Sequence, residues 1–324
     1  MNSILVYLSV HDARIKRSSL EALSRAREVG KASGMAVEAA ILHSAAAEMA
    51  SVAHAHGASK VFCMANPIFD SHLNAPLIAG LSKVIKMSSP RAVVMASTEG
   101  VKDVLGALAI RTDAAVLPDV ASFYVTSDEV TCERPVMAAK LLASTTSTHP
   151  LVFISVRSGS YEVSEGETVG TVEEVAFDFD EATLGATLRE IVQTTGDTVD
   201  LSEANVVVAA GRGVRDESGK ALVDELASIT GAAIGASRAV VETGLFPATA
   251  QIGQTGKVVS PELYFAVGIS GAIQHVAGMN NSRVIVAINK DADAPIFDVA
   301  TYGLVGDCFK ILPVLNAELR KIIS

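Results

Sequence analysis

The chain has 324 residues, a formal net charge of −10 at pH 7 and 49% hydrophobic residues. This length predicts two domains, each large enough to bury its own core. A net negative surface repels phosphate backbones, so the charge argues against a nucleic acid partner. The longest clean apolar stretch, residues 263–273, is too short to span a bilayer, and we therefore expect no direct membrane insertion.

Cysteine usage and the N-terminus favour a reducing compartment. The three cysteines, Cys63, Cys132 and Cys308, lie far apart and form no CxxC or zinc spacing. An aliphatic strand pattern begins at residue 4, so no signal or transit segment is expected before the fold. These features predict a cytoplasmic bacterial protein, or a mitochondrial matrix protein if the chain were a mature eukaryotic one.

The first part of the chain, residues 1–192, predicts an α/β domain. Aliphatic runs alternate with amphipathic helical stretches, which favours right-handed βαβ units and a parallel sheet. The predicted strands of this alternating part are residues 4–10, 36–42, 60–64 and 91–96. The later strand patterns have few helices between them and predict antiparallel additions to the same sheet. They are residues 121–125, 130–136, 151–156 and 171–178. Pro118-Asp119 and Arg134-Pro135 favour turns or strand edges.

A second α/β domain is predicted for residues 193–324. The segment of residues 178–203 carries an acidic, helix-compatible stretch and then Thr194-Thr195-Gly196-Asp197, and we place the boundary near residue 192. Strands are predicted at residues 206–210, 263–267 and 283–288, with a helix over residues 272–279. Each of these strands ends in a polar or glycine-rich turn.

Three of these turns together suggest a diphosphate cradle. They are Gly211-Arg212-Gly213, the segment from Gly268 to Gly271, and Asn289. In an open parallel sheet, ligands bind beyond the carboxyl ends of the strands. Glycine allows close backbone approach to a phosphate, and a helix N-terminus offers free N–H groups. Each of these turns, taken alone, could equally be an ordinary tight turn. The sequence contains neither of the standard nucleotide-binding motifs, GxGxxG and GxxxxGK[ST].

Further hydrogen-bonding groups stand in apolar surroundings in this half. They are Ser237-Arg238, residues 251–257 and residues 270–275. A buried polar group costs about 1–3 kcal/mol without a partner. An isoalloxazine ring would supply carbonyl acceptors, an N–H group and N5. The structural alternatives are a salt-bridged helix arginine for Arg238, turn roles for Gln254 and Thr255, and a satisfied core histidine for His275.

Other candidate sites are weaker. His54-x-His56 could hold a metal, but it falls in an alanine-rich helical stretch. His11-Asp12 follows the first strand and is better explained as a polar loop. Local motifs assemble no Ser-His-Asp or Cys-His set and no carboxylate pair. We therefore predict no metal site and no catalytic residues.

The second half resembles the electron transfer flavoprotein alpha subunit family. The resemblance runs from Gly211 to Asp307 with few gaps, and the joint pattern is far more specific than any one glycine turn. Its matching segments are residues 211–213, 235–238, 251–264, 266–279, 284–297 and 302–307. In the first half, residues 134–138 resemble a family segment, but this half is much less diagnostic.

The resemblance implies FAD as the cofactor, bound in a doubly wound, flavodoxin-like second domain. It places Arg238 near the flavin pyrimidine, His275 near O2, Thr255 near N5, and Asn289 and Asp307 towards the adenosine. The residues that match FAD-contacting positions are Arg212, Ser237, Arg238, Ile252, Gly253, Gln254, Thr255, Ser270, Gly271, Ala272, Ile273, Gln274, His275, Asn289 and Asp307.

Two departures from the family pattern are present. Ala209-Ala210 stands where Ser-Gly is usual before the first glycine turn. Residues 241–247 differ from the usual Asp-Ala-Gly-type loop and could alter one wall of the flavin pocket.

The family resemblance implies an electron carrier rather than an enzyme. Such chains form heterodimers with a beta subunit, which often holds an AMP, and the first domain is expected to dock on that subunit. Electrons come from flavin dehydrogenases of the acyl-CoA dehydrogenase type, in fatty acid beta-oxidation, and pass to a quinone oxidoreductase.

Two alternative functions remain. One is the alpha subunit of a flavin-bifurcating relative that couples NADH oxidation to ferredoxin reduction, although no cysteine cluster for an iron–sulfur centre is present. The other is an adenine-nucleotide-binding hydrolase or transferase of similar architecture, which would need a nucleophilic or phosphate-activating set.

Overall fold

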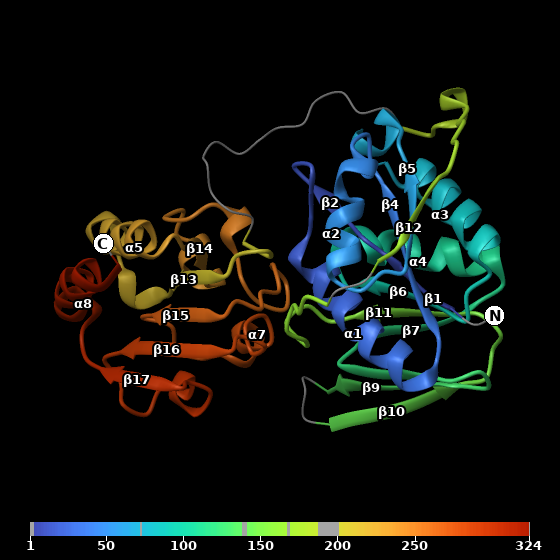
Figure 1. The fold of residues 1–324 in the computed structure, drawn as a ribbon. Coiled ribbons are helices and arrows are strands. Elements are labelled where there is room, and N and C mark those ends of the chain that lie inside the picture. Colours follow the sequence, from blue (N-terminus) through green and yellow to red (C-terminus); the bar gives the residue numbers. More distant parts are fainter. Residues whose placement is uncertain (1–2, 72, 138–140, 167–168, 187–200, 324) are drawn as a thin grey trace. The chain divides into compact units, whose positions relative to one another are not determined.

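The computed structural model describes residues 3–71, 73–137, 141–166, 169–186 and 201–323. The chain folds into two compact units, residues 1–193 and residues 194–324 (Figure 1). The boundary predicted near residue 192 lies among residues 187–200, outside the described residues.

The first unit is built on a seven-stranded sheet whose strand pairs are all parallel. The strand order is β12-β5-β4-β1-β6-β11-β7. The strands are β1 (Ser3–Tyr7), β4 (Ala36–Leu42), β5 (Lys60–Met64), β6 (Ala92–Ala96), β7 (Ala115–Val120), β11 (Val152–Val156) and β12 (Thr171–Glu174). Strands β1, β6 and β11 are buried along their whole length, which explains their continuous aliphatic sequences.

Helices cover both faces of this sheet. Residues of α1 (Arg17–Ser33) and α2 (Ala50–Ala55) belong to the core on one face, and those of α3 (Asn74–Ser88) and α4 (Glu99–Thr112) to the core on the other. The predicted βαβ architecture is therefore confirmed. A hairpin of β2 (Val10–His11) and β3 (Arg14–Ile15) follows β1.

The predicted antiparallel additions are partly wrong. Strands β11 and β12 join the main sheet in parallel, because β11 pairs with β6 and β7, and β12 pairs with β5. The antiparallel strands instead form a separate three-stranded sheet of β8 (Ser122–Val125), β9 (Val130–Val136) and β10 (Leu141–Ser147). Pro118 lies in β7, an edge strand, where its missing N–H costs no ladder hydrogen bond.

The second unit is a five-stranded parallel sheet with the order β14-β13-β15-β16-β17. Its strands are β13 (Val206–Ala210), β14 (Ala233–Ala236), β15 (Leu263–Val267), β16 (Val284–Asn289) and β17 (Tyr302–Val305). Counted from the first strand of the unit, this is the order 2-1-3-4-5, which is the flavodoxin-like order. The predicted fold class is confirmed.

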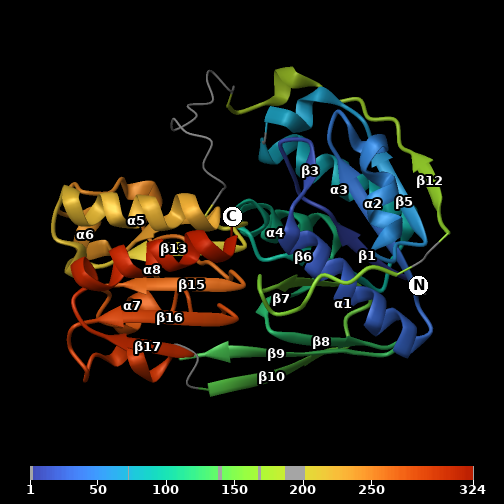
Figure 2. The ribbon, with the colours of Figure 1, turned by 60° about the vertical axis from the view of Figure 1, so that its left-hand side comes forward.

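Two long helices pack side by side on one face of this sheet: α5 (Glu217–Thr230) and α8 (Cys308–Ile323) (Figure 2). The predicted helix over residues 272–279 is shorter, since α7 spans Ile273–Val276. The helix α6 spans Arg238–Val241. Short 3₁₀ turns lie at Ala46–Met49, Pro67–Ser71, Glu181–Thr183, Arg212–Val214, Ala248–Ala250 and Pro295–Asp298.

None of the helices in the described ranges is long and apolar enough to cross a membrane.

Candidate functional site

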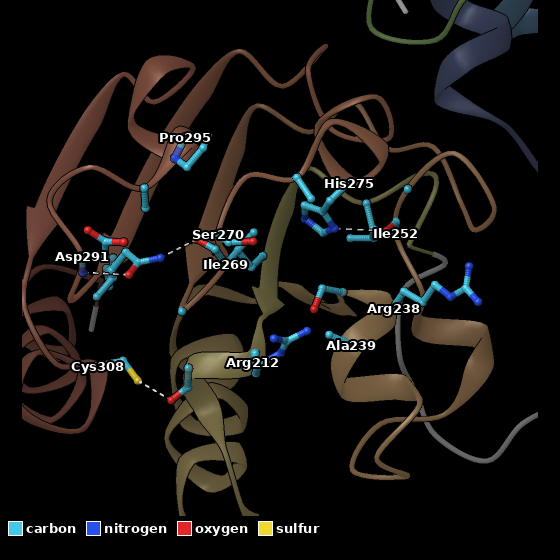
Figure 3. A pocket seen from close by; sticks show the side chains of 18 of the residues that line it. Arg212, Arg238, Ala239, Ile252, Ile269, Ser270, His275, Asp291, Pro295 and Cys308 are labelled. Carbon is cyan, nitrogen blue, oxygen red and sulfur yellow. Dashed lines mark hydrogen bonds between the residues drawn. The ribbon is translucent and has the colours of Figure 1, made fainter.

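A pocket opens at the carboxyl edge of the second sheet. The turns that follow β13 and β15 contribute to it, and these neighbouring strands flank the point where the strand order reverses, which is where doubly wound sheets bind ligands. Its volume is about 790 Å³, within the range of cofactor sites. Its wall also includes the turns after β14 and β16 and the start of α8 (Figure 3).

The structure brings most of the predicted site residues together in this wall. Those that line it are Arg212, Ser237, Arg238, Ile252, Gly253, Gln254, Thr255, Ser270, Ala272, Gln274, His275, Asn289 and Asp307. Gly271 and Ile273 lie outside the lining. Gly271 is buried with φ 87°, and a Cβ there would stand 2.2 Å from the Ile296 nitrogen. The Ile273 side chain is exposed.

The glycines of the first two turns contact each other. A Cβ on Gly211 would stand 2.3 Å from the Gly268 oxygen, and one on Gly213 would stand 2.7 Å from the Gly268 Cα. The Gly213 N–H donates to the Gly268 oxygen at 3.0 Å, and Gly268 has φ 64°. These glycines are therefore required by backbone packing between two turns, whereas the sequence suggested only approach to a phosphate.

The segment after β15 has backbone donors without backbone partners in the part of the chain that the structure describes, and Ser270, Ala272 and Gln274 of this segment line the pocket. Among the described residues, the main-chain N–H groups of residues 270–274 donate no backbone hydrogen bond. Arg212 lines the same pocket (Figure 3), and its guanidinium has no hydrogen bond or ion pair with any described residue. An unpaired cation and unpaired N–H groups in the wall of one pocket form a donor set that suits an anionic group such as a diphosphate.

The loop of residues 251–257 packs on the segment around α7. Gly253 has φ 144°, and the Gln254 N–H donates to the Gln274 carbonyl oxygen at 2.8 Å. Within the loop, Gln251 Nε2 donates to Thr255 Oγ1 at 3.0 Å. The Thr255 hydroxyl therefore accepts one hydrogen bond, and its own hydrogen remains available to a ligand.

His275 is a buried histidine with protein partners at both ring nitrogens. Nδ1 lies 3.1 Å from the Ile252 carbonyl oxygen and Nε2 lies 2.9 Å from the Tyr264 hydroxyl. A carbonyl oxygen can only accept, so Nδ1 carries the hydrogen and Nε2 accepts from Tyr264. Burial lowers the pKa of His275 to about 4, which keeps the ring neutral at pH 7. In this arrangement the imidazole has no free N–H for a ligand. This agrees with the alternative that His275 is a satisfied core histidine.

Arg238 begins α6 at the rim of the pocket. Its Nε donates to Glu242 Oε1 at 2.7 Å, and 69% of its side chain is exposed. Figure 3 shows the side chain extending away from the other labelled residues. The salt-bridged interpretation of Arg238 is correct, and it is compatible with ligand binding. The ion pair uses only Nε and leaves the two terminal nitrogens without a partner among the described residues.

The polar residues at the end of β16 and after β17 form hydrogen bonds with nearby turns. Asn289 Nδ2 donates to the Ile269 oxygen at 2.8 Å, and its Oδ1 accepts from the Asp291 N–H at 3.0 Å. Asp307 Oδ1 accepts from the Phe309 N–H at 3.1 Å at the start of α8. Both side chains still line the pocket.

Several lining residues were not singled out from the sequence. They are Arg215, Ala239, Ile288, Ala294, Pro295, Gly306 and Cys308. Most flank a predicted residue, so widening each predicted turn by a few positions would have found them. Glu242 also lines the pocket, and it belongs to the loop of residues 241–247 that the sequence named as a possible wall of the pocket.

The weaker candidates take structural roles. His54 Nδ1 lies 2.7 Å from the Ala58 oxygen, and His56 Nδ1 lies 2.8 Å from the Val52 oxygen. His11 lies beside Asp12 in the hairpin turn. In the part of the chain that the structure describes, no three His, Cys, Asp or Glu side chains form a metal-binding group. All three cysteines are buried and free.

The fold and the pocket define an α/β protein with a nucleotide-type cofactor site in a flavodoxin-like unit. The electron transfer flavoprotein FAD-binding domain family matches residues 200–280, and the electron transfer flavoprotein domain family matches residues 4–181.

Curated relatives match almost the whole chain. The electron transfer flavoprotein subunit alpha of Bacillus subtilis is 36% identical over 321 residues, 98% of each chain. That of Paracoccus denitrificans is 39% identical over 278 residues, 85% of this chain and 86% of the relative. Protein FixB of Clostridium saccharobutylicum is 34% identical over 325 residues, 99% and 97% of the two chains. The chain belongs to the electron transfer flavoprotein alpha subunit family.

The second unit is therefore an FAD-binding domain, and the chain is an electron carrier rather than a classical enzyme. The pocket fits this cofactor. Its volume suits a dinucleotide, and Arg212 with the N–H groups of residues 270–274 suits a diphosphate. The close contact of Gly213 with Gly268 keeps the floor of the pocket free of side chains at this point.

Proposed function

We propose that the chain is the FAD-carrying alpha subunit of a heterodimeric carrier. It accepts electrons from flavin dehydrogenases of the acyl-CoA dehydrogenase type and passes them singly to a quinone oxidoreductase. The observation that carries the proposal is the gathering of the predicted FAD residues, all but Gly271 and Ile273, around one pocket in the second unit. The full-length similarity to electron transfer flavoprotein alpha subunits supports it.

Different residues of the chain would bind different parts of the FAD. Arg212 and the N–H groups of residues 270–274 hold the diphosphate, and Asp307 with Asn289 faces the adenosine. Thr255 would lie beside the flavin ring, and Arg238 at the rim would turn its two terminal nitrogens towards it. The bound flavin supplies the electron chemistry, while the protein sets its potential and its exposure.

The first unit would dock on the beta subunit, which would itself bind AMP, in the cytoplasm of a bacterium. The flavin-bifurcating alternative differs from this proposal in its partners, and the hydrolase or transferase alternative differs in needing no flavin. One experiment separates all three.

The chain is co-expressed with a beta subunit and the purified complex is titrated anaerobically with an acyl-CoA dehydrogenase and its substrate. We expect a yellow complex whose oxidised flavin band bleaches and is restored by a quinone oxidoreductase with a quinone as the final electron acceptor. Reduction only by NADH, with electrons divided between ferredoxin and a second acceptor, would instead establish the bifurcating type. A colourless complex that hydrolyses an adenine nucleotide would contradict the carrier proposal.

Thr255→Val should shift the potential of the bound flavin while FAD content stays near normal. Valine keeps the shape of threonine and removes the hydroxyl hydrogen that is available to N5. That hydrogen bond contributes about 0.5–1.5 kcal/mol in the redox state that it favours. The change corresponds to roughly 20–65 mV for a one-electron couple. Spectroelectrochemical titration measures it.

Thr243→Val is the matched control, because the Thr243 hydroxyl donates to the Val240 oxygen and the residue lies outside the pocket lining. Loss of FAD from the Thr255 variant would show that Thr255 shapes the loop rather than tuning the flavin.

A further inference from the structure

Arg215 adopts a strained backbone conformation at the edge of the pocket. Its φ and ψ are 63° and −51°. The Asp216 N–H donates to the Val214 oxygen at 2.8 Å, which closes a three-residue γ-turn around Arg215. This turn, with a positive φ at its centre, is rare and strained. Glycine would adopt it at lower cost, so an arginine at this position points to a role for its side chain.

The strained turn directs the side chain towards the start of α8. Arg215 Nη2 lies 3.6 Å from Asp307 Oδ2, and the guanidinium carbon lies 5.5 Å from the centre of the Phe309 ring. Arg215 and Asp307 both line the pocket. The arginine thus connects the turn after β13 with the turn after β17.

Asp307 is held from two directions. Its Oδ1 accepts from the Phe309 N–H, and its Oδ2 faces Arg215. A carboxylate held by one hydrogen bond can still rotate about it, and the second contact, with Arg215, restricts this rotation. The guanidinium also offsets the negative charge of the carboxylate, which would otherwise repel a diphosphate nearby.

The two turns have a second, independent link. Cys308 Sγ donates to the Gly213 oxygen at 3.4 Å. Removing the Arg215 side chain therefore leaves α8 attached to the turn after β13. The effect of such a change should be confined to Asp307 and the pocket wall around it.

We propose that Arg215 is a positioning residue that orients Asp307 for the ribose hydroxyls of the adenosine half, and so favours FAD over FMN. The proposal rests on the proposed function, which places Asp307 at that end of the cofactor. A carboxylate acceptor is the group that commonly binds a ribose diol in doubly wound nucleotide sites. Arg215 itself need not touch the cofactor.

The test uses the full chain in complex with its beta subunit, freed of flavin. The affinities of FAD, FMN and ADP are measured by flavin fluorescence quenching and calorimetry for wild type, Arg215→Gly and Arg215→Lys. In Arg215→Gly we expect FAD and ADP to bind about fivefold more weakly, about 1 kcal/mol, while FMN changes less than about twofold. Arg215→Lys keeps the charge without the planar fork, so its affinities for FAD and ADP should lie between those of wild type and Arg215→Gly.

Relief of the strained turn provides a second readout. The unfolding midpoint of flavin-free Arg215→Gly should equal or exceed that of wild type, although its FAD affinity falls. If Arg215 had only a structural role, its loss would lower the unfolding midpoint and the FAD affinity together. Arg320→Ala is the matched control, because Arg320 forms a similarly exposed ion pair with Glu225 outside the pocket lining. Its affinities should equal those of wild type.

The proposal is overturned if Arg215→Gly binds FAD as wild type does, or if FAD and FMN weaken by the same factor. Should Arg215→Gly fail to fold, Arg215→Lys takes its place in the assay. Selective loss of FAD and ADP affinity then supports the proposal, and equal loss of FMN affinity overturns it. A wild-type complex that binds no FAD would instead contradict the proposed function itself.

Discussion

Gly268→Ala should destabilise the FAD-binding unit by about 2–4 kcal/mol and release its flavin. A Cβ at this position would stand 2.7 Å from Gly213 Cα and 3.0 Å from Gly213 N, both rigid backbone atoms. The positive φ of 64° adds about 1 kcal/mol for a residue with a side chain. Forced separation of the two turns adds about 1–3 kcal/mol. Urea denaturation followed by circular dichroism measures the loss of stability, and flavin fluorescence measures the release of FAD.

Gly231→Ala separates the two causes. Gly231 also has a positive φ, 62°, but no atom lies within 4 Å of the position that a Cβ would take there. The Gly231→Ala variant should therefore lose only about 1 kcal/mol of its free energy of unfolding. If both variants lost the same stability, the contact between the two glycine turns would not matter, and backbone conformation alone would explain these glycines.

The buried strands could be predicted from the sequence because they are buried on both faces. Such strands need aliphatic residues at successive positions, and β13 and β15 were predicted with the bounds that the structure gives. Edge strands lack this pattern. All four residues of β17 are exposed, and β14 is an Ala-Ile-Gly-Ala segment without β-branched or aromatic repetition. Neither could be distinguished from a loop.

Strand direction was harder to predict than strand position. The absence of intervening helices suggested antiparallel pairing for β11 and β12. The structure shows that the small β8-β9-β10 sheet lies between β7 and β11 in the chain and serves as their crossover. A parallel pair needs a long connection, but that connection need not be a helix.

The candidate site could be located from strand ends, but the roles of its side chains depend on burial and contacts. His275 shows the difference. Its sequence context is that of a ligand-binding segment, yet Tyr264 and Ile252 occupy both ring nitrogens. The strained turn at Arg215 was not predictable either, because glycine rather than arginine is the residue expected at such a φ.

Arg238→Ala should lower the first reduction potential of the bound flavin. The flavin gains negative charge around N1 and the C2 carbonyl on reduction, and a guanidinium beside them stabilises that charge. The ion pair of Arg238 with Glu242 uses only Nε, so the terminal nitrogens can donate to the ligand. A hydrogen bond to a charged group contributes about 1.5–3 kcal/mol, which corresponds to roughly 65–130 mV. Glu242 offsets part of the positive charge, so we expect the lower half of this range.

Anaerobic potentiometric titration of the complex measures the shift. Arg238→Lys should recover only part of it, since lysine keeps the charge but loses the planar fork. Arg283→Ala is the control: its side chain is similarly exposed, and its ion pair with Glu262 lies outside the pocket lining. An Arg238→Ala complex that retains FAD at an unchanged potential would assign Arg238 to the stability of α6 alone. In that case the pairing with Glu242 would be its whole role, and another group would have to stabilise the reduced flavin.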